Sequence, residues 1–256
     1  MVIDTTLPVI GLFGSNMTKP LELKEAELAA AELLAVEINR AGAVLLTGAE
    51  PKPHEYEERP ETVKDVSVYA LRNSGAGRSA IWVGVARNDH ALASRDHGAE
   101  GVVVTPGWGH RRNFVEACLC DAAIAVGGSS PGTAAEALFC LYLGRPLSLV
   151  AQRSGGTQVT PLELKSRIGT RVRAEGDRLS VDIGVAGAYA WAETTSERVM
   201  ERPLPADEAG AAGVVEKLLA KAPKHQPRPD FADFLDTSTW DDYVADSLRG
   251  AGRWKG

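Results

Sequence analysis

A glycine-rich segment in the middle of the chain has the composition of an anion-binding loop. It reads Gly127-Gly128-Ser129-Ser130-Pro131-Gly132-Thr133 and lies between an apolar run and a helical pattern. Glycines let the backbone turn tightly and bring N–H groups close to an anion, and the N-terminus of the following helix attracts the same charge. The segment matches neither G-x-G-x-x-G nor the Walker sequence, since no lysine follows its second glycine cluster. It predicts a phosphate-binding loop with contacts from Gly127, Gly128, Ser129, Ser130, Gly132 and Thr133.

A second segment, residues 106–113 (PGWGHRRN), places an aromatic, a histidine and two arginines at the expected entrance to a helix. Arginine presents a planar fork of donors that matches phosphate oxygens, and the tryptophan could stack on a base. Positive side chains in the first turn of a helix oppose its dipole, so they are poor choices for stability alone. We therefore predict that at least one arginine faces a ligand, with substrate contacts from Trp108, His110, Arg111, Arg112 and Asn113.

A third segment, residues 11–19 (GLFGSNMTK), follows the first expected strand. Gly14 permits a sharp turn, while Ser15 and Asn16 offer short polar side chains and exposed backbone donors. These three residues are further candidates for substrate binding. An ordinary strand-to-helix turn explains the same residues equally well.

Glu136 has two interpretations. The residues Thr133-Ala134-Ala135-Glu136 match a capping box, in which the glutamate bonds the backbone N–H of the threonine at the start of a helix. Alternatively, the carboxylate faces the ligand that the glycine-rich segment binds. Both interpretations stay open at this point.

Short apolar runs alternate with longer helical patterns over the first 150 residues. The runs are continuously apolar, which is typical of strands buried on both faces of a parallel sheet. This alternation predicts an α/β fold with a doubly wound, mostly parallel sheet flanked by helices, that is, a Rossmann-like fold. Ligands bind such sheets outside the carboxyl ends of the strands, where the three segments lie. The expected strands are 9–13, 43–46, 80–86, 101–105, 122–126 and 147–150, and the expected helices are 21–40, 61–72, 110–120 and 133–143.

The pattern weakens after residue 150 and predicts a less regular C-terminal extension. A helix over 161–168, a hairpin from 171–173 and 179–183, and a helix over 206–220 are expected there. Residues 222–230 (APKHQPRPD) are typical of a linker, and 240–248 form a short acidic amphipathic stretch. We therefore expect a Rossmann-like nucleotide-binding domain over 1–221 and a linker with a C-terminal tail over 222–256.

Composition narrows the classes of function. The chain has 256 residues, 44% of them hydrophobic, which is ordinary for a globular protein. Its formal net charge of −6 disfavours nucleic acid as a partner. The cysteines Cys118, Cys120 and Cys140 fall in apolar stretches, which indicates core packing rather than disulfides or a zinc site. With neither a signal-peptide pattern nor a long apolar run, we expect a cytoplasmic protein with no membrane contact, metal or cofactor.

Several motifs together resemble the Lonely guy (LOG) family of phosphoribohydrolases, within the wider SLOG superfamily of Rossmann-like proteins. The resemblance covers roughly residues 8–150. It differs from the family where Val126 replaces a proline and where the second glycine-rich segment is reduced to Thr47-Gly48-Ala49. The motifs that carry it are Arg112-Asn113, the run CDAAIAVGG over 120–128, and Gly132-Thr133 with Glu136.

The resemblance implies hydrolysis of the N-glycosidic bond of a nucleoside 5′-monophosphate to a free base and ribose 5-phosphate. Such cleavage passes through an oxocarbenium-like sugar, which a carboxylate can stabilise. Arg112 and Glu136 would be the catalytic pair, with the phosphate on the glycine-rich segment, and the family further implies a homodimer. Arg112 stays protonated and would bond the phosphate or the departing base, while His110 could donate a proton to that base. Asp121 would precede the fifth strand at the opposite end, so we interpret it as structural.

Three other functions remain open. The reduced glycine segment favours a nucleotide-binding or sensing module that binds a nucleotide or related phosphorylated small molecule without turnover. Deoxyribosyl transfer between bases would need the same oxocarbenium chemistry. Single-stranded DNA binding would need a basic groove with aromatic platforms, and the net acidity counts against it.

Overall fold

The computed structural model describes residues 6–14, 21–48, 62–74, 82–87, 101–105, 110–127, 131–151, 172–175, 178–182, 189–193 and 199–222. Its central feature is a seven-stranded sheet in the order β10-β6-β5-β1-β2-β3-β4, in which all neighbouring strands are parallel. The doubly wound Rossmann-like fold is therefore confirmed. The strands are β1 (Val9–Gly14), β2 (Val44–Gly48), β3 (Trp82–Arg87), β4 (Gly101–Thr105), β5 (Ala122–Val126), β6 (Leu147–Ala151) and β10 (Val199–Pro203).

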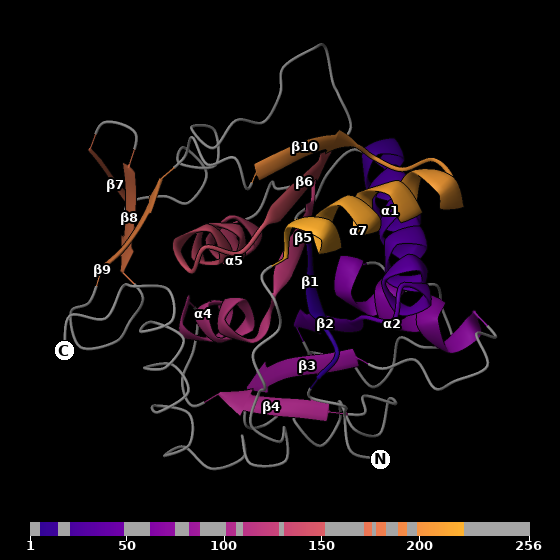
Figure 1. The fold of residues 1–256 in the computed structure, drawn as a ribbon, viewed down its shortest axis with the longest axis horizontal. Coiled ribbons are helices and arrows are strands. Elements are labelled where there is room, and N and C mark those ends of the chain that lie inside the picture. Colours follow the sequence, from indigo (N-terminus) through magenta and orange to yellow (C-terminus); the bar gives the residue numbers. More distant parts are fainter. Residues whose placement is uncertain are drawn as a thin grey trace.

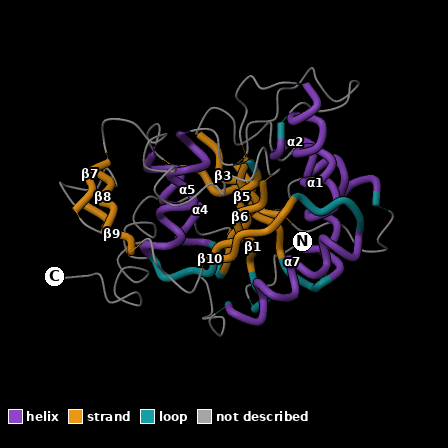
Figure 2. Tube along the Cα trace, turned by 90° about the horizontal axis from the view of Figure 1, so that it is seen from above, coloured by secondary structure: helices purple, strands orange, loops and turns teal. Residues whose placement is uncertain are grey.

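Helices cover both faces of this sheet. On one face α1 (Leu21–Arg40) packs against α2 (Val63–Asn73) and α7 (Glu208–Lys221). On the other face α4 (His110–Leu119) packs against α5 (Pro131–Tyr142). Figure 1 shows the two helical layers on opposite sides of the strands, and the view in Figure 2 agrees. Because helices cover both faces, the central strands are buried on both sides of the sheet, which explains their continuous apolar runs.

The order of the strands reverses beside β1. The chain lays down β1, β2, β3 and β4 in one direction and then returns to place β5 on the other side of β1. The two strands are in register from Ile10 opposite Ala122 to Gly14 opposite Val126. Their carboxyl ends therefore form the topological switch point, which is the usual place for a ligand in an open α/β sheet.

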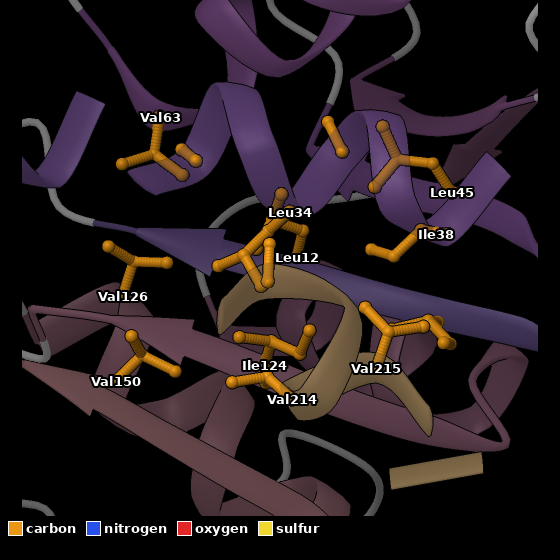
Figure 3. Close-up of a cluster of buried hydrophobic side chains, with 14 of the residues drawn as sticks. Leu12, Leu34, Ile38, Leu45, Val63, Ile124, Val126, Val150, Val214 and Val215 are labelled. Atoms are coloured by element: carbon orange, nitrogen blue, oxygen red, sulfur yellow. The ribbon is translucent and has the colours of Figure 1, made fainter. Parts of the chain in front are cut away.

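The core on the α1 face is built from alternate residues of the strands. Leu12 of β1 and Ile124 of β5 pack under Leu34 of α1 and Val214 of α7, with little or no exposure. Figure 3 shows these side chains converging between the strands and the two helices. On the other face, Phe114 of α4 meets Phe139 of α5 edge to face at 5.2 Å between ring centroids. The sheet is thus held from both sides by side chains from distant parts of the sequence.

Asp121 joins the amino ends of β1 and β5. Its Oδ2 accepts a hydrogen bond from the backbone N–H of Val9 at 2.8 Å, and its own N–H donates to the carbonyl of Val9 at 2.8 Å. The side chain is buried and lies at the end of the strands opposite the switch point. The structural interpretation of this aspartate is confirmed.

The C-terminal extension contains more strand than the sequence predicts. β7 (Val172–Glu175) and β8 (Arg178–Asp182) form the expected antiparallel hairpin, with Glu175 opposite Arg178. β9 (Tyr189–Glu193) adds a third antiparallel strand next to α5, and β10 joins the main sheet beside β6. Neither β9 nor β10 was predicted, because YAWAE and VMERP lack a β-branched apolar run. The helix expected over 161–168 lies outside the described residues, as does the linker and tail expected over 222–256 apart from Ala222.

Candidate functional site

The candidate site lies at the switch point, where three chain segments meet. Gly14 ends β1, Gly127 follows β5 directly, and α5 begins at Pro131. The α5 helix lies on the face opposite α1, so the two helices approach this point from opposite sides of the sheet. The fold thus brings the first and third of the segments singled out in the sequence to one edge, and a hydrogen bond from Asn113 to Gly132 joins the second segment to the third.

Gly127 has a backbone conformation that other residues rarely adopt. Its φ is +73°, in the left-handed region. Its N–H donates to the carbonyl of Val150 in β6 at 2.8 Å, so that N–H is engaged in the sheet. Gly127 would therefore contribute to a phosphate site through its left-handed backbone conformation. Its own N–H is not available to donate to the phosphate, although the glycine-rich loop suggested that contact.

Glu27 of α1 lies directly against Gly127. A Cβ atom built on the glycine would lie 2.2 Å from Oε1 and 2.5 Å from Oε2 of the glutamate. The Glu27 side chain is only 4% exposed. This residue was not predicted from the sequence, although a signal was present: it falls on the helix face that carries Leu28, Leu34 and Ile38, where a charged residue is unusual.

Gly14 is required by packing. A Cβ atom at this position would lie 2.3 to 2.6 Å from three side-chain atoms of Val63, at the start of α2. Any larger residue would push α2 away from the end of β1. The ordinary structural explanation therefore accounts for this glycine, and a substrate contact from its backbone stays a prediction.

The start of α5 excludes the capping-box interpretation of Glu136. The helix begins at Pro131, two residues earlier than expected, and proline is favoured at the first helical position. Thr133 is then the third helical residue and Glu136 the sixth, whereas a capping box needs them at the N-cap and third positions. Both side chains are buried, at 2% and 7% exposure. The role of Glu136 must therefore come from its place on the helix interior, not from capping.

Asn113 ties the starts of the two helices together. Its Nδ2 donates to the carbonyl oxygen of Gly132 in the first turn of α5, at 3.3 Å, and its side chain is buried. Asn113 was expected from the sequence to contact the substrate. The structure shows a positioning contact for it, because it holds α4 against the glycine-rich segment.

The remaining predicted site residues are described only in part. His110, Arg111 and Arg112 form the first turn of α4, which packs beside α5, and the structure describes their backbone alone. The proximity of Arg112 to Glu136 stays a prediction. Outside the described residues lie Ser15, Asn16, Trp108, Gly128, Ser129 and Ser130.

The cysteines are core residues, as predicted. Cys118, Cys120 and Cys140 are all buried between α4, α5 and the sheet. Burial raises the pKa of the Cys140 thiol far above its usual range. The Cys120 thiol donates to the carbonyl of Glu116 at 3.0 Å. These thiols are unsuited to nucleophilic chemistry at neutral pH.

In the described ranges, no group of histidine, cysteine, aspartate and glutamate is arranged to hold a metal ion. No helix in the same ranges has the length and apolar character needed to cross a membrane.

Comparison with known proteins gives a likeness of fold. No protein-family model matches the chain, and no curated protein matches it. A solved structure of the Moco carrier protein from Chlamydomonas reinhardtii is 24% identical, with a TM-score of 0.50, over 84% of this chain and 99% of that chain. Another structure of the molybdenum cofactor carrier protein from this alga is 25% identical over the same shares, with a TM-score of 0.49. A molybdenum cofactor binding protein from the phototrophic bacterium Rippkaea orientalis is 22% identical, with a TM-score of 0.46, over 63% of this chain and 87% of that chain. The match at a TM-score of 0.50 supports the Rossmann-like fold.

Proposed function

We propose that this chain binds a small molecule through a phosphate at the switch point between β1 and β5, and holds it without chemical change. The observation that carries the proposal is the left-handed Gly127 between the end of β5 and the start of α5. A glycine there lets the chain leave the sheet and enter a helix whose N-terminus faces the carboxyl ends of the strands. The nucleotide-binding module weighed from the sequence fits this geometry better than the hydrolase does.

The phosphate seat would be the first turn of α5. The first N–H groups of any helix lack acceptors within the helix, and the helix dipole adds partial positive charge there. Pro131 supplies no N–H, so the donors of this turn begin at Gly132. Asn113 fixes the turn by holding the Gly132 carbonyl.

The molybdenum cofactor is our candidate for the bound molecule. It is a phosphorylated pterin compound that carries molybdenum, so it offers the phosphate that the site requires. The choice is motivated by the fold shared with the Moco carrier protein. The match covers 99% of that protein's chain. The cofactor would be cargo, and the homodimer implied by the resemblance to the Lonely guy family stays a prediction.

Hydrolysis of a nucleoside 5′-monophosphate is the second candidate. It is favoured by Glu136, whose buried side chain does not cap the helix. Glu136 lies within two turns of α5 from the proposed phosphate seat. The reaction would still require Arg112 to reach the same ligand. A carboxylate near the sugar could stabilise an oxocarbenium-like transition state.

One set of measurements separates the two candidates. The purified chain is mixed with molybdenum cofactor released from a molybdoenzyme, or with each common nucleoside monophosphate, and then passed through a desalting column. We expect the cofactor to stay with the protein at a stoichiometry that saturates, and no nucleotide to release free base. Release of free base that is lost in Glu136→Gln would favour the hydrolase. Failure to retain any phosphorylated ligand would contradict the binding proposal.

A further inference from the structure

Helix α5 is buried on every side. Every residue from Ala135 to Leu143 is at most 8% exposed, and this stretch makes about two and a half turns, so it includes all directions around the helix axis. A helix that only lies on a sheet keeps a polar side toward solvent, as α7 does with Glu216 and Lys217. The side of α5 that faces away from the main sheet must therefore be covered as well.

The three-stranded sheet lies on that side. From the main sheet, β5 and β6 contact α5, and α4 packs beside it. Strand β9 also contacts α5. Figure 1 and Figure 2 both place α5 between the main sheet and β7–β9. The helix is thus enclosed by the main sheet, by α4 and by a sheet from the C-terminal half of the same chain.

The register of β7–β9 gives this small sheet two unlike faces. Successive positions of a strand alternate between the faces, and positions opposite each other on neighbouring strands share a face. One face carries only alanine, valine and leucine, in two rows across the strands: Val172, Val181 and Ala190, then Ala174, Leu179 and Ala192. The other face carries the charged positions, among them a row that alternates in sign: Glu175, Arg178 and Glu193. An antiparallel sheet with this alternation buries its apolar face and leaves the other to water.

We infer that β7–β9 is an intramolecular cover for α5, with its apolar face packed on the outer side of the helix. The apolar sheet face and the outer side of the helix both need burial, and β9 already contacts α5. The chain thus supplies from its own C-terminal half the layer that a partner subunit would otherwise have to supply. The outer side of α5 is closed to a second copy, so the homodimer implied by the resemblance to the Lonely guy family would have to form through another surface.

A pair of matched variants tests which face of the small sheet covers α5. Ala190→Asp adds a carboxylate on the apolar face, and Ser180→Asp adds one on the opposite face. Burying a charge against an apolar helix is unfavourable, so amides of residues 135–143 and 189–193 should exchange hydrogen about tenfold faster in Ala190→Asp than in the wild-type chain. Ser180→Asp should exchange at the wild-type rate. Mass spectrometry of peptides from the full chain measures both variants, with α1 as the internal reference.

Equal acceleration at residues 135–143 in both variants, or in neither, would overturn the inference. If α1 also lost its protection in Ala190→Asp, the milder Ala190→Ser would replace it in the comparison. The expected result is then a smaller acceleration that is confined to the same two segments, and its absence would overturn the inference equally.

Dilution of the wild-type chain separates a cover from the same chain from one supplied by a partner subunit. An intramolecular contact does not depend on protein concentration, so the protection of residues 135–143 should be unchanged by about a hundredfold dilution. Faster exchange of these residues in the dilute sample would show that a second copy covers α5, and would contradict the role of β7–β9.

Discussion

At the carboxyl end of β5, the Glu27 carboxylate occupies the space that a side chain at position 127 would need. A Cβ atom at position 127 would lie far closer to the glutamate carboxylate than non-bonded atoms can approach. The φ of +73° adds a second reason for glycine, since a side chain is strained in the left-handed region. Two independent constraints therefore act on the residue that begins the candidate phosphate loop.

Gly127→Ala should destabilise the chain by about 1–3 kcal/mol, because the alanine is strained and contacts Glu27. In the double variant Gly127→Ala with Glu27→Ala, the contact is relieved but the backbone strain remains. The double variant should therefore lose less stability than the sum of the two single variants. Urea denaturation midpoints measure all three, and strictly additive losses would contradict the contact between the two residues.

Cys140 should resist thiol reagents in the folded chain. Because burial raises the pKa of this thiol, the reactive thiolate is scarce at neutral and mildly alkaline pH. Between pH 7 and 9, alkylation of the native protein should stay slow. In denaturant the rate should rise about tenfold per pH unit until the ordinary pKa is reached. Peptide mass mapping after timed alkylation measures both, and rapid native labelling at position 140 would contradict the burial.

At the scale of elements, the pairing of β1 with β5 decides where the site forms. Asp121 anchors the amino ends of these strands through the N–H of Val9, while Gly14 and Val126 pair at the other end. The switch point lies at the second of these ends. A change at Asp121 should therefore act on stability without touching the ligand.

Asp121→Ala should cost about 1–3 kcal/mol, because it leaves the buried N–H of Val9 without its acceptor. Asp121→Asn keeps an oxygen at the same place and should recover most of the loss. Thermal denaturation measures the change in stability. Phosphate titration, at a temperature where the variant is folded, measures the affinity of the site for phosphate. A loss of phosphate affinity in the folded Asp121→Ala variant would show that this residue acts on the ligand site as well.

At the scale of the whole molecule, α7 completes the layer that begins with α1. Val214, Val215 and Leu218 enter the main core, although α7 follows α1 by more than 160 residues. At the amino end of α7, Glu208 pairs with Arg40 at 2.8 Å. Helix α7 is thus part of the Rossmann-like unit and not an appended element.

Leu218→Ala should lower the free energy of unfolding by about 2–5 kcal/mol, because the leucine is fully buried and the alanine leaves a cavity. Lys217→Ala, its exposed neighbour, is the matched control and should have little effect. Chemical denaturation followed by circular dichroism measures both variants. Equal stability of the two would mean that α7 does not contribute to the core.

The amino-acid sequence by itself determined the parallel sheet, its first six strands and most helix boundaries. These follow from local rules: apolar runs for strands buried on both faces, and glycines such as Gly42 and Gly144 at helix ends. The glycine-rich segment was also visible from composition, as was the structural role of Asp121. Each of these features is encoded within a few neighbouring residues.

Only the tertiary structure decided the rest. β10 is a strand because β6 offers it hydrogen bonds, not because VMERP favours that conformation. The capping box that the sequence suggested at Thr133 is not formed, because the helix starts at Pro131. Glu27 meets Gly127 only after α1 has packed on the sheet, since 100 residues separate them in the chain. Contacts of this kind depend on packing between distant segments, and no local pattern encodes them.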